Sequence, residues 1–473
     1  MLKLKNQKTI LKNHLISGLV VFTVLIGSLA VFGQIAKAQG QPSMISPPLH
    51  NLGNSAYIMD NEKEIATARW DTINAENEEI FQGYLGWDTQ KIGYADFAAL
   101  YNSGKTKKIK RGRVMIDGWG QGSLPDPNIA ASYNLATLKA LLKYGVEVRF
   151  YNPTTTMSAL LTPGKSMGRM HFKVTWLKGQ NIVESGDPNN LSINFRADHH
   201  LGKRGVGYRS TETMMQGPVY LDVQEYIEDA WAHGTAPDLS SVTDDELANA
   251  ERNLERYFKA AKAIREKNPA IDWASKLKPI ESIKFIHDTV EQKGILFPLH
   301  DRFQSFIDSS EKTEGPLYLI SPYIDLPTPL FEAIKRARQR GVEVTVITTS
   351  MQSSDMKMSS YVFVPQAENL QALGVKVYIH DNKDLLHIKM VKQGNTVFSG
   401  LSDNLNNRSK ETDIEGGYEF TDPKYAADAD QIINTLITKE TKPFDSSTLT
   451  TGTMCLVRVW QAFSQVPFIH NQL

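Results

Sequence analysis

Short apolar runs alternate with amphipathic stretches along most of the chain. Residues 113–117 (RVMID) have the composition of a buried strand, and the apolar positions of residues 135–142 follow the spacing of a helix. Residues 145–151 (GVEVRFY) return to β-branched and aromatic residues after a glycine that ends the helix. This order of strand, helix and strand predicts an α/β layer in which helices cover a sheet.

The second half of the chain repeats this order. Residues 316–320 are a predicted strand, residues 330–338 a helix and residues 341–347 another strand, and residues 374–379 are a further strand. Gly-Val-Glu-Val occurs at residues 145–148 and again at 341–344. We interpret the match as an internal duplication with a period of about 200 residues, which predicts two similar α/β domains.

A long helix is predicted between the two halves. Thr243 and Glu246 have the spacing of a capping box, and Leu247, Leu254 and Phe258 mark one apolar face of the helix that follows. This helix is either part of the connection between domains or an ordinary core helix, and the pattern does not separate the two.

Length and composition indicate a folded protein of two domains. The chain has 473 residues, of which 41% are hydrophobic and 22% charged, and this excludes general disorder. Its formal net charge is zero, but residues 1–38 hold five lysines and no acid, so the remainder has 47 basic and 52 acidic residues. A net charge of −5 argues against wrapping nucleic acid by bulk electrostatics.

The first 38 residues have the features of a secretory signal peptide. Lysines precede an apolar run at residues 15–33, and Ala36 and Ala38 before Gln39 fit a small-x-small cleavage site. The apolar run is also long enough for an uncleaved membrane anchor, and both interpretations predict export of the rest of the chain. Cys455 is the only cysteine, which excludes an internal disulfide.

Two His-x-Lys tripeptides follow the predicted α/β units. His171 and Lys173 come after the first unit and precede residues 185–192 (SGDPNNLS), whereas His387 and Lys389 come after the second and precede residues 402–406 (SDNLN). One His-x-Lys is common by chance. Two copies in matching halves, each followed by an Asn-Leu element, indicate a shared function.

The residue types suit attack on a phosphodiester. In a strand, residues i and i+2 project from one face, so each histidine and its lysine would point into one cleft. One imidazole can attack phosphorus and form a phosphohistidine while the other protonates the departing alcohol. Lysine, asparagine and serine side chains would stabilise charge on the nonbridging oxygens. This scheme requires no metal and no organic cofactor.

These motifs resemble those of the phospholipase D superfamily, whose signature is His-x-Lys-x4-Asp followed by Gly-Ser-x-Asn. Residues 168–173, 217–219, 321–323 and 348–355 look like the cardiolipin synthase-like branch, which has two motifs in one chain. The likeness covers residues 75 to 440. The chain departs from the signature at Lys178 and Gly394, where the family has Asp, and at Leu401, where it has Gly.

The resemblance implies an α/β fold of two similar phospholipase D-like α/β/α sandwich domains, packed with pseudo-twofold symmetry. A signal peptide or anchor (residues 1–38) and a leader (39–74) are expected to precede the two domains. The domains are expected at residues 75–270 and 271–440, followed by a C-terminal extension (441–473).

The resemblance also assigns site residues. It makes His171 the nucleophile and His387 the general acid, although the better preserved second copy allows the reverse, and it assigns Glu415 to orient an imidazole. Asp198 is the corresponding candidate in the first copy. The implied catalytic residues are His171, Lys173, His387 and Lys389. The implied phosphate-binding residues are Asn189, Asn190, Ser402 and Asn404.

The implied activity is that of an exported phosphodiesterase or phosphatidyltransferase acting on phospholipids at a membrane surface. A nuclease with the same chemistry and an inactive lipid-binding protein are the alternatives. We expect no nucleic-acid partner and a monomer. His199 and His200, beside Asp198, are either metal ligands or solvated loop residues, and we assign no metal to them.

Overall fold

A computed structural model describes residues 50–89, 91–118, 133–152, 168–190, 207–291 and 293–464, which belong to one compact unit, residues 45–473. The predicted signal peptide, Asp198 and the pair His199 and His200 lie outside the described residues. Across the described ranges, none of the helices has both the length and the apolar character needed to cross a bilayer.

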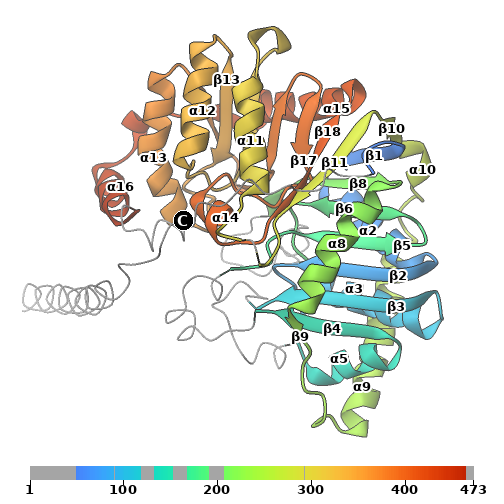
Figure 1. The fold of residues 1–473 in the computed structure, drawn as a ribbon. Coiled ribbons are helices and arrows are strands. Elements are labelled where there is room, and N and C mark those ends of the chain that lie inside the picture. Colours follow the sequence, from blue (N-terminus) through green and yellow to red (C-terminus); the bar gives the residue numbers. More distant parts are fainter. Residues whose placement is uncertain are drawn as a thin grey trace, which may run out of the picture. The chain divides into compact units, whose positions relative to one another are not determined.

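The first half of the chain builds a nine-stranded sheet in the order β10-β1-β8-β6-β5-β2-β3-β4-β9 (Figure 1). Its strands are β1 (Asn54–Met59), β2 (Asn77–Tyr84), β3 (Ile109–Asp117), β4 (Val146–Tyr151), β5 (Val174–Lys178), β6 (Ile182–Gly186), β8 (Glu212–Gln216), β9 (Gly234–Thr235) and β10 (Lys278–Ile280). The helices of this half are α2 (Glu62–Asn74), α3 (Lys91–Lys105), α5 (Leu135–Lys143), α8 (Val219–Ala232), α9 (Asp244–Arg265) and α10 (Trp273–Lys276).

The second half builds an eight-stranded sheet in the order β11-β18-β17-β16-β12-β13-β14-β19. Its strands are β11 (Ser282–His287), β12 (Leu317–Ile320), β13 (Val344–Thr349), β14 (Lys376–His380), β16 (Met390–Gln393), β17 (Thr396–Ser399), β18 (Gly416–Thr421) and β19 (Thr441–Pro443). The helices are α11 (Pro298–Ser309), α12 (Thr328–Gln339), α13 (Lys357–Ala372), α14 (Asn407–Glu411), α15 (Pro423–Thr435) and α16 (Thr451–Ser464), with short 3-10 turns at Lys312–Glu314 and Ser446–Thr448 and a π turn at Leu436–Glu440.

The two sheets are copies of one topology. When β10 is set aside, each position of the first sheet has a counterpart in the second, from β1 and β11 at one edge to β9 and β19 at the other. Each pair of neighbouring strands also has the same sense in both sheets; for example, β2 and β3 are parallel, as are β12 and β13. The predicted duplication and the two-domain α/β fold are therefore confirmed.

The Gly-Val-Glu-Val match, however, compared strands that are not equivalent. Residues 145–148 begin β4, which corresponds to β14, whereas residues 341–344 lead into β13, which corresponds to β3. Gly145 and Gly341 have φ values of 81° and 83°, because each reverses the chain after a helix. The shared sequence reflects this common turn, and the site residues give a different offset, from His171 to His387.

Three cores hold the molecule together. One packs α2, α3, α5 and α9 on the first sheet, and another packs α11, α12 and α13 on the second sheet. The third is shared by both halves, with α8 and α15 contributing apolar side chains between the two sheets. Since α8 follows β8 and α15 follows the equivalent β18, the halves meet through equivalent surfaces, as pseudo-twofold symmetry requires.

Folded structure begins and ends at different residues from those we predicted. Strand β1 and helix α2 lie within residues 39–74, the predicted leader, and β10 belongs to the first sheet although it follows residue 270. Strand β19 completes the second sheet beyond residue 440. Helix α9 begins at the predicted capping box and packs with α3 and α5, so it is a core helix of the first half.

Candidate active site

The two His-x-Lys tripeptides are each held by the opposite half of the chain. They lie directly before β5 and β16 and not within a strand, which corrects the prediction. The main-chain nitrogen of His171 donates to Ile414 (3.1 Å), and that of His387 donates to Arg209 (2.8 Å). In addition, β15 (Leu385–Leu386) pairs in parallel with β7 (Tyr208–Arg209). Both motifs therefore sit at the junction of the halves.

The middle residue of each tripeptide anchors it in the shared core. Phe172 and Ile388 are fully buried among apolar side chains from both halves. Because neighbouring side chains of an extended segment point in opposite directions, the histidine and lysine on either side of each anchor point away from this core.

Hydrogen bonds join the two motifs directly. The hydroxyl of Ser185 donates to the carbonyl oxygens of Lys173 and Gly400, both at 3.0 Å. The main-chain nitrogen of Lys389 donates to Oδ1 of Asp187 at 3.1 Å. The motifs, 216 positions apart along the chain, are thus held in one site.

The pKa values of His387 and Lys173 depend on charged side chains from both His-x-Lys motifs. Burial lowers the pKa of His387 well below its ordinary value, and the charges of Lys389, Lys173 and His171 lower it further. Burial also lowers the pKa of Lys173, with Lys389 the next largest cause. Side chains of both motifs therefore contribute to one electrostatic environment.

His171 has a carboxylate partner from the second half. Its Nδ1 lies 3.0 Å from both carboxylate oxygens of Glu415, which is fully buried. Although burial favours the neutral acid, His171 and Lys173 hold the pKa of Glu415 below its ordinary value. An ionised Glu415 accepts a hydrogen bond from the N–H at Nδ1 of His171, which leaves Nε2 with its lone pair.

Glu415 is itself fixed by two neighbours. The hydroxyl of Ser402 donates to its carboxylate, and the main-chain nitrogen of Glu415 donates to Asp288 at 3.1 Å. Ser402 in turn accepts from the main-chain nitrogen of Gly416 at 3.0 Å. Ser402, assigned to phosphate binding from the sequence, therefore supports the Glu415 carboxylate in this structure.

His387 has different surroundings. Its Nε2 lies 3.3 Å from Nζ of Lys389, and within the described part of the chain its Nδ1 has no hydrogen-bond partner. The ring centroids of Tyr208 and Tyr323 lie 5.1 Å and 6.3 Å from its own, and both hydroxyls donate to Asp355, at 2.6 Å and 2.5 Å. His387 thus lies among cations and aromatic rings.

The two lysines form a buried cationic centre, and one of them has no hydrogen-bond partner among the described residues. Lys173 is 1% exposed, and its Nζ has no hydrogen-bond partner among the described residues. Nζ of Lys389 donates to the carbonyl oxygen of His387 at 3.1 Å and lies 3.9 Å from the Asp187 carboxylate. Burial lowers the pKa of both lysines, and an anion bound here would favour their charged forms.

The asparagines differ in the hydrogen bonds available for a ligand. Asn190 is fully buried and donates to Asp96 at 2.8 Å, whereas Asn189 accepts from the Gly86 nitrogen at 3.0 Å. Asn189 and Asn404 are each 7% exposed, and Oδ1 of Asn404 has no hydrogen-bond partner among the described residues. Asn189 and Asn404 are therefore the better candidates for phosphate contact.

Among the residues that the structure describes, one group of side chains lies close enough to hold a metal ion: His171, Asp413 and Glu415. Asp413 already forms an ion pair with Arg408 at 2.8 Å and accepts from the main-chain nitrogen of Arg169 at 3.1 Å. Glu415 accepts from His171 and Ser402. Their oxygens therefore have hydrogen-bond partners, and we assign these residues to positioning.

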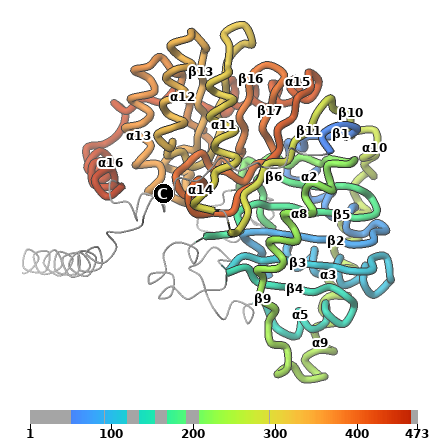
Figure 2. Tube along the Cα trace, in the orientation of Figure 1, coloured from blue at the N-terminus to red at the C-terminus, as the bar shows by residue number. Residues whose placement is uncertain are grey.

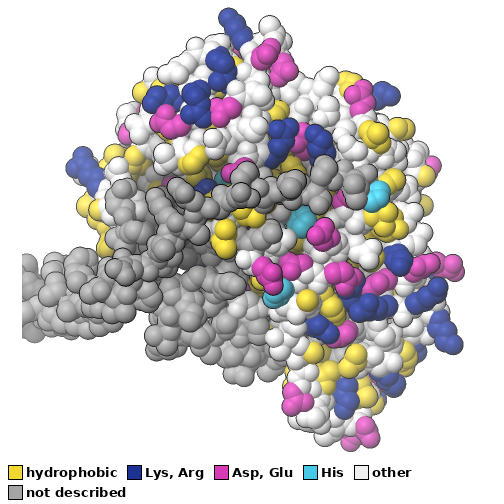
Figure 3. Space-filling view, viewed as in Figure 1, with side chains coloured by type: hydrophobic (Ala, Val, Ile, Leu, Met, Phe, Trp, Pro, Cys, Tyr) yellow, Lys and Arg dark blue, Asp and Glu magenta, His cyan; other side chains and the backbone are white. Residues whose placement is uncertain are grey.

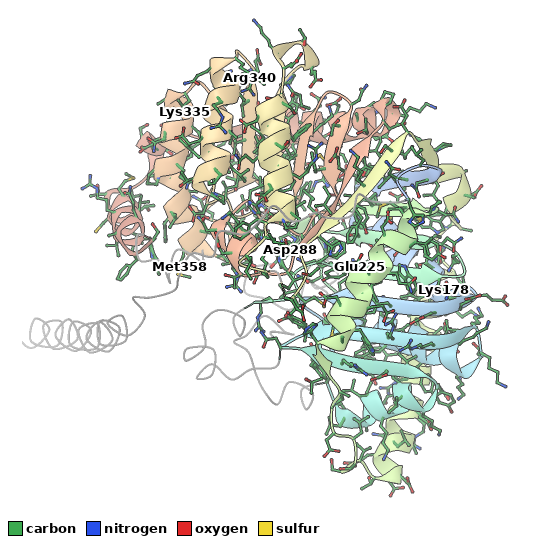
Figure 4. The ribbon with its side chains drawn as sticks, viewed as in Figure 1. Lys178, Glu225, Asp288, Lys335, Arg340 and Met358 are labelled. Carbon is green, nitrogen blue, oxygen red and sulfur yellow. The ribbon has the colours of Figure 1, made fainter. Side chains whose placement is uncertain are left out.

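The two departures at the aspartate positions of the family signature lie away from this centre. Lys178 ends β5 and is half exposed beside Glu78, and Gly394 lies in the turn between β16 and β17. Figure 4 shows Lys178 at the far end of the first sheet from Asp288, which contacts Glu415. Neither departure changes a group that contacts the two histidines or their lysines.

Sequence reasoning missed several residues of the site. Asp187, Asp288, Tyr208, Tyr323 and Asp355 become neighbours of the motifs only through tertiary structure. Asp187 belongs to residues 185–192, but its contact with Lys389 crosses between halves. Residues 321–323 and 348–355 resemble the family, but their sequence alone predicts no contact with His387.

Comparison with known proteins agrees with this site. Residues 305–437 match the family described as "Cardiolipin synthase, PLD-like domain". A phosphatidylserine synthase from Haemophilus influenzae Rd KW20 has a similar structure, with a TM-score of 0.64 and 13% identity, over 90% of this chain and 98% of that one. No match was found among curated protein sequences.

Two further solved structures have lower similarity. A polyphosphate kinase from Porphyromonas gingivalis has a TM-score of 0.44 and 11% identity, over 87% of this chain and 56% of that one. A phospholipase D family member, Nuc, from Salmonella typhimurium has a TM-score of 0.27 and 15% identity, over 35% of this chain and 99% of that one. The family match shows that residues 305–437 form a cardiolipin synthase-like, phospholipase D-like domain, and the first half of the chain repeats the topology of that domain and its His-x-Lys motif.

Proposed function

We propose that this protein is an exported phosphodiesterase or phosphatidyltransferase that acts on phospholipids through a phosphohistidine intermediate. The observation that carries the proposal is the contact of Nδ1 of His171 with Glu415, beside His387 and two buried lysines from both halves. This arrangement supplies a nucleophile, a proton donor and an anion site in one place.

In the first step, Nε2 of His171 attacks phosphorus and the bond to the leaving oxygen breaks. The electron pair stays on that oxygen, which takes a proton from His387. The proton on Nδ1 of His171 stays hydrogen-bonded to Glu415, and this carboxylate stabilises the positive charge that the ring gains. Water or an alcohol, deprotonated by His387, then attacks phosphorus and releases His171.

The other polar groups favour the transition state. Lys173 and Lys389 stabilise negative charge on the nonbridging oxygens, and Asn189 and Asn404 offer amide donors. The choice of His171 as nucleophile rests on its tautomer, which Glu415 fixes. His387 has no such carboxylate among its described contacts, and its Nε2 lies 3.3 Å from Nζ of Lys389.

A lipid substrate is favoured over nucleic acid by charge. Residues 39–473 have a net charge of −5. On the face shown in Figure 3, basic and acidic side chains are mixed and form no continuous basic stripe of the kind that binds a polynucleotide. Export, expected from residues 1–38, would bring the site to the outer side of the cytoplasmic membrane.

Purified full-length protein, incubated with vesicles of phosphatidylglycerol, phosphatidylethanolamine and phosphatidylcholine, tests the proposal. We expect headgroup release or phosphatidyl transfer that is lost in His171→Ala and in His387→Ala. Lys178→Ala, which changes a lysine remote from the site, is the matched control and should retain activity. Acid quenching should trap phosphorus on His171.

Three other results would contradict the proposal. Cleavage of labelled single-stranded DNA without lipid turnover would make the protein a nuclease. Vesicle binding without turnover by the unmodified protein would make it an inactive lipid-binding member. Phosphorus trapped on His387 would exchange the roles of the histidines. Export is tested separately, by whether the mature N-terminus is Gln39.

A further inference from the structure

The pseudo-symmetry of the site identifies which residue faces His387. The His171 nitrogen donates to the carbonyl of Ile414, and the next residue, Glu415, contacts Nδ1 of His171. The His387 nitrogen donates in the same way to the carbonyl of Arg209, and the next residue is Ser210. Ser210 therefore occupies, opposite His387, the position that Glu415 occupies opposite His171.

Ser210 does not replace the carboxylate. It is 6% exposed and His387 is 4% exposed. In the part of the chain that the structure describes, neither the Ser210 hydroxyl nor Nδ1 of His387 has a hydrogen-bond partner. A neutral hydroxyl cannot balance the charge of an imidazolium, so no carboxylate of the described residues holds a proton on His387 in the way that Glu415 does on His171.

Other groups around His387 do not compensate. Lys389 lies on its own segment, and Lys173 and His171 face it from the segment before β5. The main chain of Asp187, which follows β6, raises the pKa of His387, but burial and the three basic side chains lower this pKa by more. From β7 and from the loop after β12, Tyr208 and Tyr323 present rings, and their hydroxyls bind the Asp355 carboxylate.

We propose that Ser210 leaves His387 seldom protonated, so that the site favours phosphodiesters whose leaving group departs as a stable anion. The inference rests on the proposed function, in which His387 protonates the leaving oxygen. When the phosphorus–oxygen bond breaks, an acidic leaving group such as a phenol or a phosphate keeps the electron pair without a proton. An alkoxide must take a proton, and only His387 supplies it.

Leaving-group dependence in the unmodified protein tests the inference without any variant. Probes are short-chain phosphatidyl esters of phenols with graded acidity, and phosphatidylglycerol as the alkyl ester, in the same mixed micelles. We expect kcat/KM to rise steeply with phenol acidity and to be lowest for phosphatidylglycerol. A flat dependence, with phosphatidylglycerol cleaved as fast as the esters of acidic phenols, would overturn the inference.

Supplying a carboxylate provides the second test. In Ser210→Glu we expect turnover of phosphatidylglycerol to rise by roughly tenfold or more, while esters of the most acidic phenols change little. The upper pH limit of kcat/KM should also move to higher pH. Ser210→Gln, of the same size but uncharged, is the matched control and should show neither change. Equal behaviour of the Glu and Gln variants, with native melting curves, would count against the inference.

Two further variants separate the possible failures. Loss of phosphatidylglycerol turnover in Asp198→Asn, with phenyl esters unaffected, would show that another carboxylate serves His387 and would overturn this inference alone. Turnover of phenyl esters that survives His171→Ala would instead overturn the proposed function. The two ideas therefore fail by different results.

Discussion

The two histidines of the site differ in the residue that the backbone places opposite them. Glu415 binds Nδ1 of His171, whereas Ser210 has the equivalent backbone position opposite His387. A carboxylate fixes the tautomer of an imidazole and stabilises its cation, and a hydroxyl does neither strongly. The two halves are alike in topology, but the two rings are not alike in chemistry.

Glu415→Gln tests the role of the carboxylate at constant size. We expect kcat to fall by roughly 100-fold or more with a smaller change in KM, because the amide can present its NH2 to Nδ1 and stabilise the wrong tautomer. Steady-state kinetics on phospholipid micelles measure this, and a melting curve checks the fold.

Ser402→Ala tests the same carboxylate with a milder change. It removes one donor to Glu415 but leaves the carboxylate, so we expect a smaller loss of kcat. Full activity in Glu415→Gln would show that the contact with His171 is structural.

At this scale the sequence predicted the residue types of the site but only part of their contacts. His171, Lys173, His387 and Lys389 carry a motif, and Glu415 lies at the family spacing. The position of Ser402 against Glu415 and that of Asp187 against Lys389 depend on a chain reversal and on packing between halves, which no local spacing encodes.

Among the elements, the first sheet contains a buried acidic cluster that the second sheet lacks. Glu184 on β6 and Glu212 on β8 are each 1% exposed, and Arg69 on α2 pairs with Glu212. Phe398 occupies the position of Glu184 on the equivalent strand β17. Burial, and then the charge of Glu212, raises the pKa of Glu184 to about 8.

This shift predicts a pH-dependent stability. The unfolded chain releases the Glu184 proton near the ordinary value of 4.5, while the folded chain keeps it until about 8. The free energy of unfolding should therefore fall as pH rises between these values and then level off. Glu184→Gln, which keeps an acceptor for Thr72, should remove this dependence and raise stability at pH 8 by on the order of 1–4 kcal/mol.

Thermal melting of both proteins at pH 5 and pH 8 measures the effect. We expect similar Tm values at pH 5 and a higher Tm for Glu184→Gln at pH 8. A Tm for Glu184→Gln that is lower than that of the unmodified protein at pH 8 would show that an ionised Glu184 is stabilised in the fold.

The sequence predicted individual strands and helices better than it predicted which strands of the two sheets are equivalent. Strands β3, β4, β12, β13 and β14 and helices α5, α9 and α12 follow periodicity and capping signals. Pairing β4 with β13 as copies was wrong, because a glycine turn before a strand looks the same wherever a helix ends. Strand β1 was missed inside a segment rich in turn residues, since its place beside β8 is set by tertiary contacts.

In the whole molecule, the covalent connection between the sheets is slight and the packed contact is large. Figure 2 shows the chain passing from β10 into β11, and only Glu281 separates these strands. The shared core, in contrast, draws apolar residues from both sheets and from α8 and α15. Packing, and not the linker, therefore holds the site together.

A chain nicked between the halves should remain active. A protease site inserted between Pro269 and Ala270, both exposed, would be cut without opening the core. We expect the two fragments to elute together in size-exclusion chromatography and to retain most phospholipid turnover, and β10 of the second fragment would still pair with β1 of the first. Fragments that separate in buffer, with activity lost, would show that the linker is essential.

The duplicated topology within one polypeptide has a further consequence. Two identical subunits related by a twofold axis would carry the same amino acid at both symmetry-related positions, because one gene would encode both. A fused chain is free of that constraint, and here it holds glutamate on one side of the axis and serine on the other. Fusion thus allows each half to evolve its own step of a reaction for which both halves are needed.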